Sequence, residues 1–100
     1  MKKIIIINGP NLNLLGNREK SIYGNSTLED IKNNTENRAR ELNLECFFCQ
    51  SNNEGELINF IQSVNDNYDG LIINPAAFTH TSIAILDSLR AVDKPKIEIH

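Results

Sequence analysis

Two hydrophobic patterns alternate along the chain. Short apolar runs rich in β-branched residues are followed by longer polar segments in which apolar residues recur every three or four positions. The first pattern is typical of buried strands and the second of amphipathic helices. We therefore predict strands at 3–7, 44–50, 70–74 and 96–100, and helices at 26–43, 54–65 and 82–92. A long polar loop, 8–25, separates the first strand from the first helix.

Polar residues mark where two of the helices begin. Ser26 followed by Glu29 has the spacing of a capping box, which predicts that the first helix starts there. Ser82 precedes the apolar stripe of the third helix and is expected to be its N-cap. Ser82 could also be grouped with His80 and Asp87 as a hydrolase triad, but no G-x-S-x-G motif supports that alternative.

Strands that alternate with helices predict a parallel sheet built from right-handed βαβ units, and therefore an α/β fold. In open sheets of this kind, ligands bind beyond the carboxyl ends of the strands. Three predicted strands end in segments rich in amide, aromatic and ionisable side chains. We expect one rim of the sheet to collect Asn11, Arg18, Tyr23, Asn74, His80 and His100.

Composition narrows the class of protein. With 100 residues, of which 40% are hydrophobic and 23% charged, the chain is expected to form a single domain over 1–100. The net charge of −3 and the lack of a basic block argue against nucleic acid as a partner. The longest aliphatic run, at 4–7, is too short to span a membrane. Two cysteines without an export signal point to the cytoplasm.

The motif "CFFC" has the C-x-x-C spacing of redox and zinc sites. Cys46 and Cys49 fall inside a predicted strand, where residues three apart point to opposite faces. We therefore predict two unpaired core cysteines. The chain also lacks the G-x-G-x-x-G and P-loop fingerprints of nucleotide-binding proteins.

Two pairs of residues suggest proton transfer. Glu98 and His100 are two apart on a predicted strand and so share a face, where a carboxylate could orient a histidine. A metal site would need a third ligand, which His80 could supply, but nothing else in the sequence favours a metal. A merely solvated strand end is the other alternative. Arg18 near Tyr23 would favour the phenolate and make the tyrosine a better base, although an ordinary polar loop would also contain such a pair.

Three separated motifs, "INGPNLNLLGNREKSIYG", "NPAAFTHTS" and "IEIH", together resemble the type II 3-dehydroquinate dehydratases of the shikimate pathway. The resemblance implies a flavodoxin-like fold with a five-stranded parallel sheet. It also implies elimination of water from 3-dehydroquinate to give 3-dehydroshikimate, without a metal or organic cofactor. Such enzymes assemble as trimers that group into dodecamers, so the resemblance implies a homo-oligomer.

The resemblance also implies roles for individual residues. Tyr23 matches the base that removes the proton next to the ketone, and Arg18 matches the lid residue that activates it. Asn11 matches an asparagine near the base that helps to place a water molecule, and this water stabilises the enolate. His100 matches the general acid, and Glu98 the residue that orients it. The remaining matches are substrate contacts at Asn74, Ala76 and His80, and a residue that reaches a neighbouring subunit's site, Asp87.

The family continues beyond the histidine of its E-x-H motif, into a serine, an arginine, a fifth strand and a last helix. We therefore expect a family member that stops just after its catalytic acid, with four strands, feeble activity and Ile97 or Ile99 uncovered. Two other interpretations remain. The chain could be an inactive remnant that only binds a ligand or a partner, or it could be an unrelated flavodoxin-like binding module.

Overall fold

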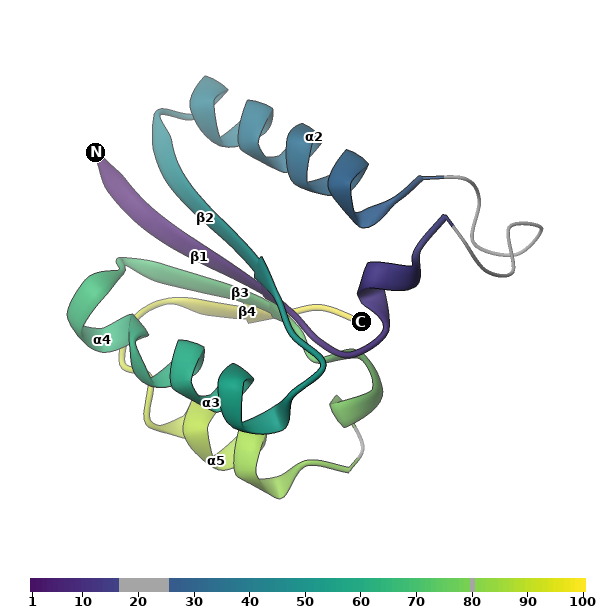
Figure 1. Cartoon of the computed structure of the whole chain (residues 1–100). Coiled ribbons are helices and arrows are strands. Elements are labelled where there is room, and N and C mark those ends of the chain that lie inside the picture. Colours follow the sequence, from purple (N-terminus) through teal and green to yellow (C-terminus); the bar gives the residue numbers. More distant parts are fainter. Residues whose placement is uncertain (17–25, 80) are drawn as a thin grey trace.

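The computed structural model describes residues 1–16, 26–79 and 81–100. Four parallel strands form one sheet in the order β2-β1-β3-β4, with helices on both of its sides (Figure 1). The strands are β1 (Lys2–Asn8), β2 (Leu44–Gln50), β3 (Gly70–Asn74) and β4 (Lys96–Glu98). The helices are α2 (Leu28–Glu41), α3 (Glu54–Gln62), α4 (Val64–Asn67) and α5 (Ile83–Arg90), with 3-10 turns η1 (Leu12–Leu14) and η2 (Ala76–Thr79). The predicted parallel α/β fold is confirmed.

The main core lies between the two central strands and the helix pair α3 and α5. Alternate side chains of β1 and β3 point to this side, and Ile5, Ile7, Leu71 and Ile73 are at most 2% exposed. From α3 and α5 come Leu57, Ile61, Ile85 and Leu89, all in the same cluster. Burying each such side chain contributes about 1.5–3 kcal/mol, so this face supplies most of the hydrophobic stabilisation.

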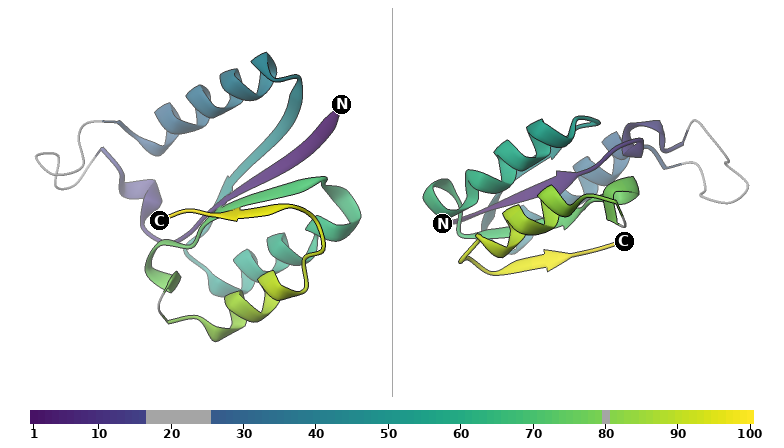
Figure 2. Two further views of the ribbon diagram at one scale, coloured as in Figure 1. Left: turned by 180° about the vertical axis from the view of Figure 1, so that it is seen from behind. Right: turned by 90° about the horizontal axis from the view of Figure 1, so that it is seen from below.

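The opposite face of the sheet is less completely covered. Helix α2 packs on this side, mainly over β2, as the two views in Figure 2 also show. Ile6 of β1 is buried there, whereas Ile97 and Ile99 are 59% and 46% exposed. Strand β4 is an outer strand of the described sheet and pairs only with β3. The expectation that these two isoleucines would lack cover is therefore confirmed.

The start of α2 differs from the prediction by one residue. The capping box is formed by Thr27 and Asp30, with hydrogen bonds of 3.1 Å from the Asp30 N–H and 3.0 Å from the Thr27 N–H. Ser26, which we predicted as the cap, lies before it. The sequence offers two overlapping pairs with capping-box spacing, Ser26 with Glu29 and Thr27 with Asp30. The second pair forms, and β-branched Thr27 has the extended backbone of an N-cap residue. The helix begins at Leu28 for this reason.

Other boundaries also shift. The predicted helix 54–65 is interrupted at Ser63, whose hydroxyl donates to the Phe60 carbonyl at 2.6 Å, and α4 follows as a separate short helix. A serine hydroxyl that binds the backbone in this way competes with helical geometry. Helices α2 and α5 end at Glu41 and Arg90, and β4 ends at Glu98, all slightly earlier than predicted.

Cys46 and Cys49 are unpaired, as predicted, but both are only partly buried. Cys49 packs against the main core, whereas Cys46 lies outside that cluster. They stand opposite Ile4 and Ile7 of β1. Burial raises the pKa of both thiols, because it disfavours the thiolate, and Glu56 adds to the effect at Cys49. The pKa of Cys49 rises from 9.0 to about 12. This thiol therefore stays neutral and behaves as a core side chain.

The raised pKa of Cys49 predicts a loss of stability in alkali. Above about pH 9 the unfolded chain releases the thiol proton and the folded chain keeps it, so the free energy of unfolding falls as the pH rises towards 12. The slope from this group is at most about 1.4 kcal/mol per pH unit. Urea unfolding from about pH 8 to about pH 11 should show a shallower decline in Cys49→Ala than in the wild type. Identical declines would contradict the prediction.

Candidate active site

A cavity of about 440 Å³ opens beyond the carboxyl ends of β1, β3 and β4. Turns η1 and η2 and the C-terminal residue gather at this end of the sheet (Figure 1). The lining residues are Pro10, Asn11, Leu12, Leu15, Asn74, Ala76, Ala77 and His100. The structure thus brings together four residues that sequence reasoning selected: Asn11, Asn74, Ala76 and His100. Arg18, Tyr23 and His80 lie outside the described residues.

The two segments that lead into the cavity from β1 and β3 approach each other closely just after the strands end. The Gly9 N–H donates to the Asn74 carbonyl at 2.8 Å and so extends the pairing of β1 with β3 past the strand ends. A Cβ atom on Gly9 would lie 2.4 Å from the Pro75 carbonyl oxygen. Only glycine allows these segments to meet at this separation. Sequence reasoning did not select Gly9, although a glycine directly after a buried strand is a signal for such an approach.

Asn74 shapes the β3 side of the cavity. Its Oδ1 accepts a hydrogen bond of 3.1 Å from the Ala76 N–H, which turns the chain sharply after the strand. Ala76 has a φ of 52°, in the left-handed region that alanine rarely adopts. This conformation starts η2 and places Ala76 and Ala77 in the cavity wall. Strained backbone of this kind is often found at functional sites.

Asn11 shapes the β1 side. It has a φ of 68°, also in the left-handed region, and its carbonyl accepts from the Leu14 N–H at 2.9 Å to form η1. Its side chain makes no capping hydrogen bond to that turn, and the residue lines the cavity. Leu12 and Leu15 of the same segment add apolar surface to the wall. Neither leucine was selected from the sequence, because apolar residues in a polar loop resemble ordinary packing residues.

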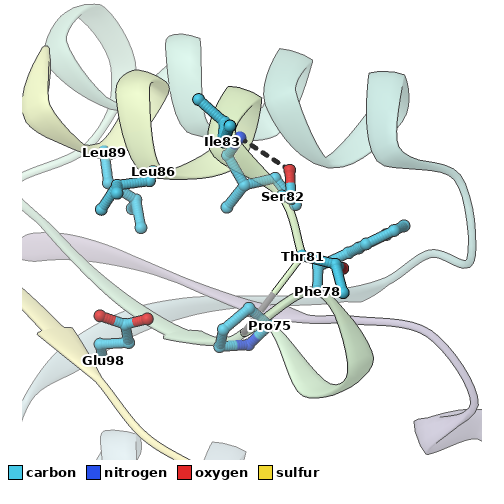
Figure 3. A pocket seen from close by; sticks show the side chains of 9 residues that line it. Pro75, Phe78, Thr81, Ser82, Ile83, Leu86, Leu89 and Glu98 are labelled. Atoms are coloured by element: carbon cyan, nitrogen blue, oxygen red, sulfur yellow. Dashed lines mark hydrogen bonds between the residues drawn. The ribbon is translucent and has the colours of Figure 1, made fainter.

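Glu98 lines a second pocket, of about 260 Å³, between α5 and the ends of β3 and β4. Figure 3 shows its carboxylate opposite Leu86 and Leu89 of α5. His100 lines the first cavity instead, because β4 ends at Glu98 and strand alternation does not continue to residue 100. The orienting role of Glu98 stays a prediction.

Ser82, which lines the same pocket, has a structural role at the start of α5. Its hydroxyl accepts a hydrogen bond of 3.0 Å from the Ile85 N–H, the dashed line in Figure 3. The same hydroxyl donates to Glu54 Oε2 at 2.6 Å. Ser82 is thus the N-cap of α5, as predicted, and also joins the starts of α3 and α5. Asp87 is exposed on α5 and does not line the first cavity.

The first cavity offers amide groups, one imidazole and apolar walls. Within the described residues, no three His, Cys, Asp or Glu side chains gather closely enough to hold a metal ion. An imidazole can transfer a proton near neutral pH, and amide groups can bind hydroxyl and carbonyl oxygens. The arrangement suits acid–base chemistry on a small polar molecule, and the volume falls within the usual range for ligand sites.

Comparison with known proteins identifies the family. The sequence profile described as "Dehydroquinase class II" matches residues 2–100. The chain belongs to the class II dehydroquinase family. It is 49% identical to the 3-dehydroquinate dehydratase of Caldanaerobacter subterraneus subsp. tengcongensis over 100 residues, which cover all of this chain and 68% of that protein. It is 54% identical to the Caldicellulosiruptor saccharolyticus enzyme, with 70% of that protein covered.

Solved structures of the family have the same fold. The type II dehydroquinase of Butyrivibrio crossotus superimposes with a TM-score of 0.94 at 48% identity, covering 99% of this chain and 70% of that one. A 3-dehydroquinate dehydratase-like protein from Bifidobacterium longum is more distant, with a TM-score of 0.75 and 29% identity over 100% of this chain and 72% of that one. The resemblance seen in the three sequence motifs is confirmed, and with it the fold.

Proposed function

We propose that this chain is a 3-dehydroquinate dehydratase, a hydro-lyase of the shikimate pathway that eliminates water from 3-dehydroquinate to give 3-dehydroshikimate. Two findings support this function. The match to the class II dehydroquinase family extends over residues 2–100. The observation that carries most weight is the first cavity, of about 440 Å³, because it brings together three of the residues that the family's chemistry needs, Asn11, Asn74 and His100.

The proposed mechanism has two proton transfers. The Tyr23 phenolate, favoured by Arg18, takes the proton from the carbon next to the ketone, and the electron pair of that C–H bond forms the enolate. Asn11 helps to stabilise the negative charge on the enolate oxygen. When the enolate collapses, the C–O bond breaks and a carbon–carbon double bond forms. The departing hydroxyl takes a proton from His100 and leaves as water.

The other predicted residues complete the proposal. Asn74, Ala76 and His80 bind the substrate, Glu98 orients His100, and Asp87 reaches the site of a neighbouring subunit in a homo-oligomer of trimers grouped into dodecamers.

Residues 1–100 belong to one domain, and the protein acts in the cytoplasm. Among the helices of the described residues, none has both the length and the apolar composition needed to cross a membrane.

A direct assay tests the function. Purified chain incubated with 3-dehydroquinate should form the conjugated enone product, which absorbs in the ultraviolet, faster than the buffer control. The Caldicellulosiruptor saccharolyticus dehydratase serves as the positive control. Substrate binding without any product would contradict the proposal and would favour a chain that only binds its ligand.

A further inference from the structure

The backbone of Asn11 is held by a side chain from the segment that follows β2. The Asn11 N–H donates to Asn52 Oδ1 at 2.9 Å. Asn52 follows β2, which lies beside β1 in the sheet, so the contact joins segments 41 residues apart in sequence. Asn52 itself does not line the cavity. Any influence it has on the chemistry must therefore act through Asn11.

Gln50 extends this contact into a network of amides. Its Nε2 lies 3.1 Å from Asn52 Oδ1, 3.2 Å from the Gly9 carbonyl and 3.4 Å from Asn13 Oδ1. Two amide protons are shared among these three acceptors. The network thus contacts residues on both sides of Asn11. It also orients the Asn52 amide so that its oxygen faces the Asn11 N–H.

The segment that carries Asn52 is itself firmly placed. The Ser51 N–H donates to the Asn8 carbonyl at 3.0 Å, and Asn8 Nδ2 donates to the Cys49 carbonyl at 2.9 Å. The Ser51 hydroxyl is nearly buried and accepts from the Asn53 N–H at 2.9 Å. Asn53 in turn caps α3 through the Glu56 N–H. Asn52 therefore stands between a strand end and a capped helix.

We propose that Asn52, assisted by Gln50, is a positioning residue that holds Asn11 in its left-handed conformation and so aims the Asn11 side chain into the cavity. This inference rests on the proposed function. The left-handed region is unfavourable for most residues, and asparagine tolerates it better than most because its short side chain can form local hydrogen bonds. The bond from the Asn11 N–H to Asn52 adds a further restraint on this conformation. Without the acceptor on Asn52, Asn11 can relax, and a displacement of about 1 Å at a catalytic group lowers rates by up to about 10²-fold.

Three variants test the proposal in the full chain. Asn52→Ala removes the acceptor and should lower kcat about 10-fold with little change in KM, because Asn11 acts on the enolate rather than on substrate binding. Asn52→Asp keeps oxygen acceptors and should retain most of the activity. Asn53→Ala is the matched control, since it removes the α3 cap and should lower the melting temperature without a comparable fall in kcat.

A second measurement does not depend on turnover. Hydrogen exchange followed by NMR should show the Asn11 amide exchanging roughly 10-fold faster in Asn52→Ala, but not in Asn52→Asp or Asn53→Ala. Unchanged kcat or unchanged exchange in an active Asn52→Ala variant would overturn this inference while leaving the proposed function in place. Absence of turnover in the wild type would instead contradict the proposed function. It would also contradict the predicted effect of Asn52 on kcat.

Discussion

Replacing His100 by alanine is expected to lower kcat for dehydration by about 10²–10⁴-fold, the contribution usually made by a general acid. The hydroxyl that leaves is a poor leaving group unless a proton reaches it as the C–O bond breaks. Among the described residues that line the cavity, only His100 carries an ionisable side chain. Initial rates of enone formation at saturating substrate measure the effect.

The control for this prediction is the neighbouring exposed residue. Ile99 is 46% exposed and does not line the cavity, so Ile99→Ala should keep kcat within a few fold of the wild type. Both variants should melt within a few degrees of the wild type, because His100 is exposed at the end of the sheet. A His100→Ala variant with near wild-type turnover would rule out His100 as the acid.

Replacing Gly9 by alanine is expected to have the second large effect. The new Cβ would lie 2.4 Å from the Pro75 carbonyl oxygen, and backbone on both sides must move to accept it. Overpacking of this kind costs about 1–3 kcal/mol of unfolding free energy, and more where backbone is the obstacle. The same movement would displace the adjoining cavity residues Pro10, Asn74 and Ala76. Urea unfolding and the dehydration assay should therefore both show losses.

Gly55→Ala is the matched control for Gly9→Ala. Gly55 is exposed in the first turn of α3, and a Cβ there would approach only the side-chain oxygen of Asn53, at 3.2 Å. Because alanine is a better helix former than glycine by about 1 kcal/mol, the stability of this variant should stay close to that of the wild type or rise slightly. Equal effects of the two substitutions would show that the contact with Pro75 does not constrain the fold.

Regular periodicity explains why much of the fold could be predicted. The strands at 44–50 and 70–74 occur with the predicted bounds, and all three predicted helices are present. Their apolar residues repeat with the period of one element type, so local patterning and burial agree. The ends of the helices were less predictable. Two overlapping residue pairs have the spacing of a capping box before α2, and only one of them forms. The predicted helix 54–65 is interrupted where the Ser63 hydroxyl binds the Phe60 carbonyl.

For the candidate site too, some features could be predicted from the sequence and others could not. The rule that ligands bind beyond strand ends was enough to select Asn11, Asn74 and His100, which line one cavity. The amide contact from Asn52 could not be predicted, because it joins residues that only the pairing of β1 with β2 brings together. Strand alternation predicted that Glu98 and His100 share a face, but the two residues line different pockets. The alternation does not reach His100 because β4 ends at Glu98.

The sequence alone determined the α/β class, most strands and helices, the family and the end of the sheet where the chemistry is proposed. These features depend on periodicity and on motifs, which are local and can be read residue by residue. Only the tertiary structure decided that Gly9 meets Pro75, that Asn11 and Ala76 adopt left-handed conformations, and that Asn52 holds Asn11. Such features depend on distances between segments far apart in sequence, and those distances exist only once the strands have paired.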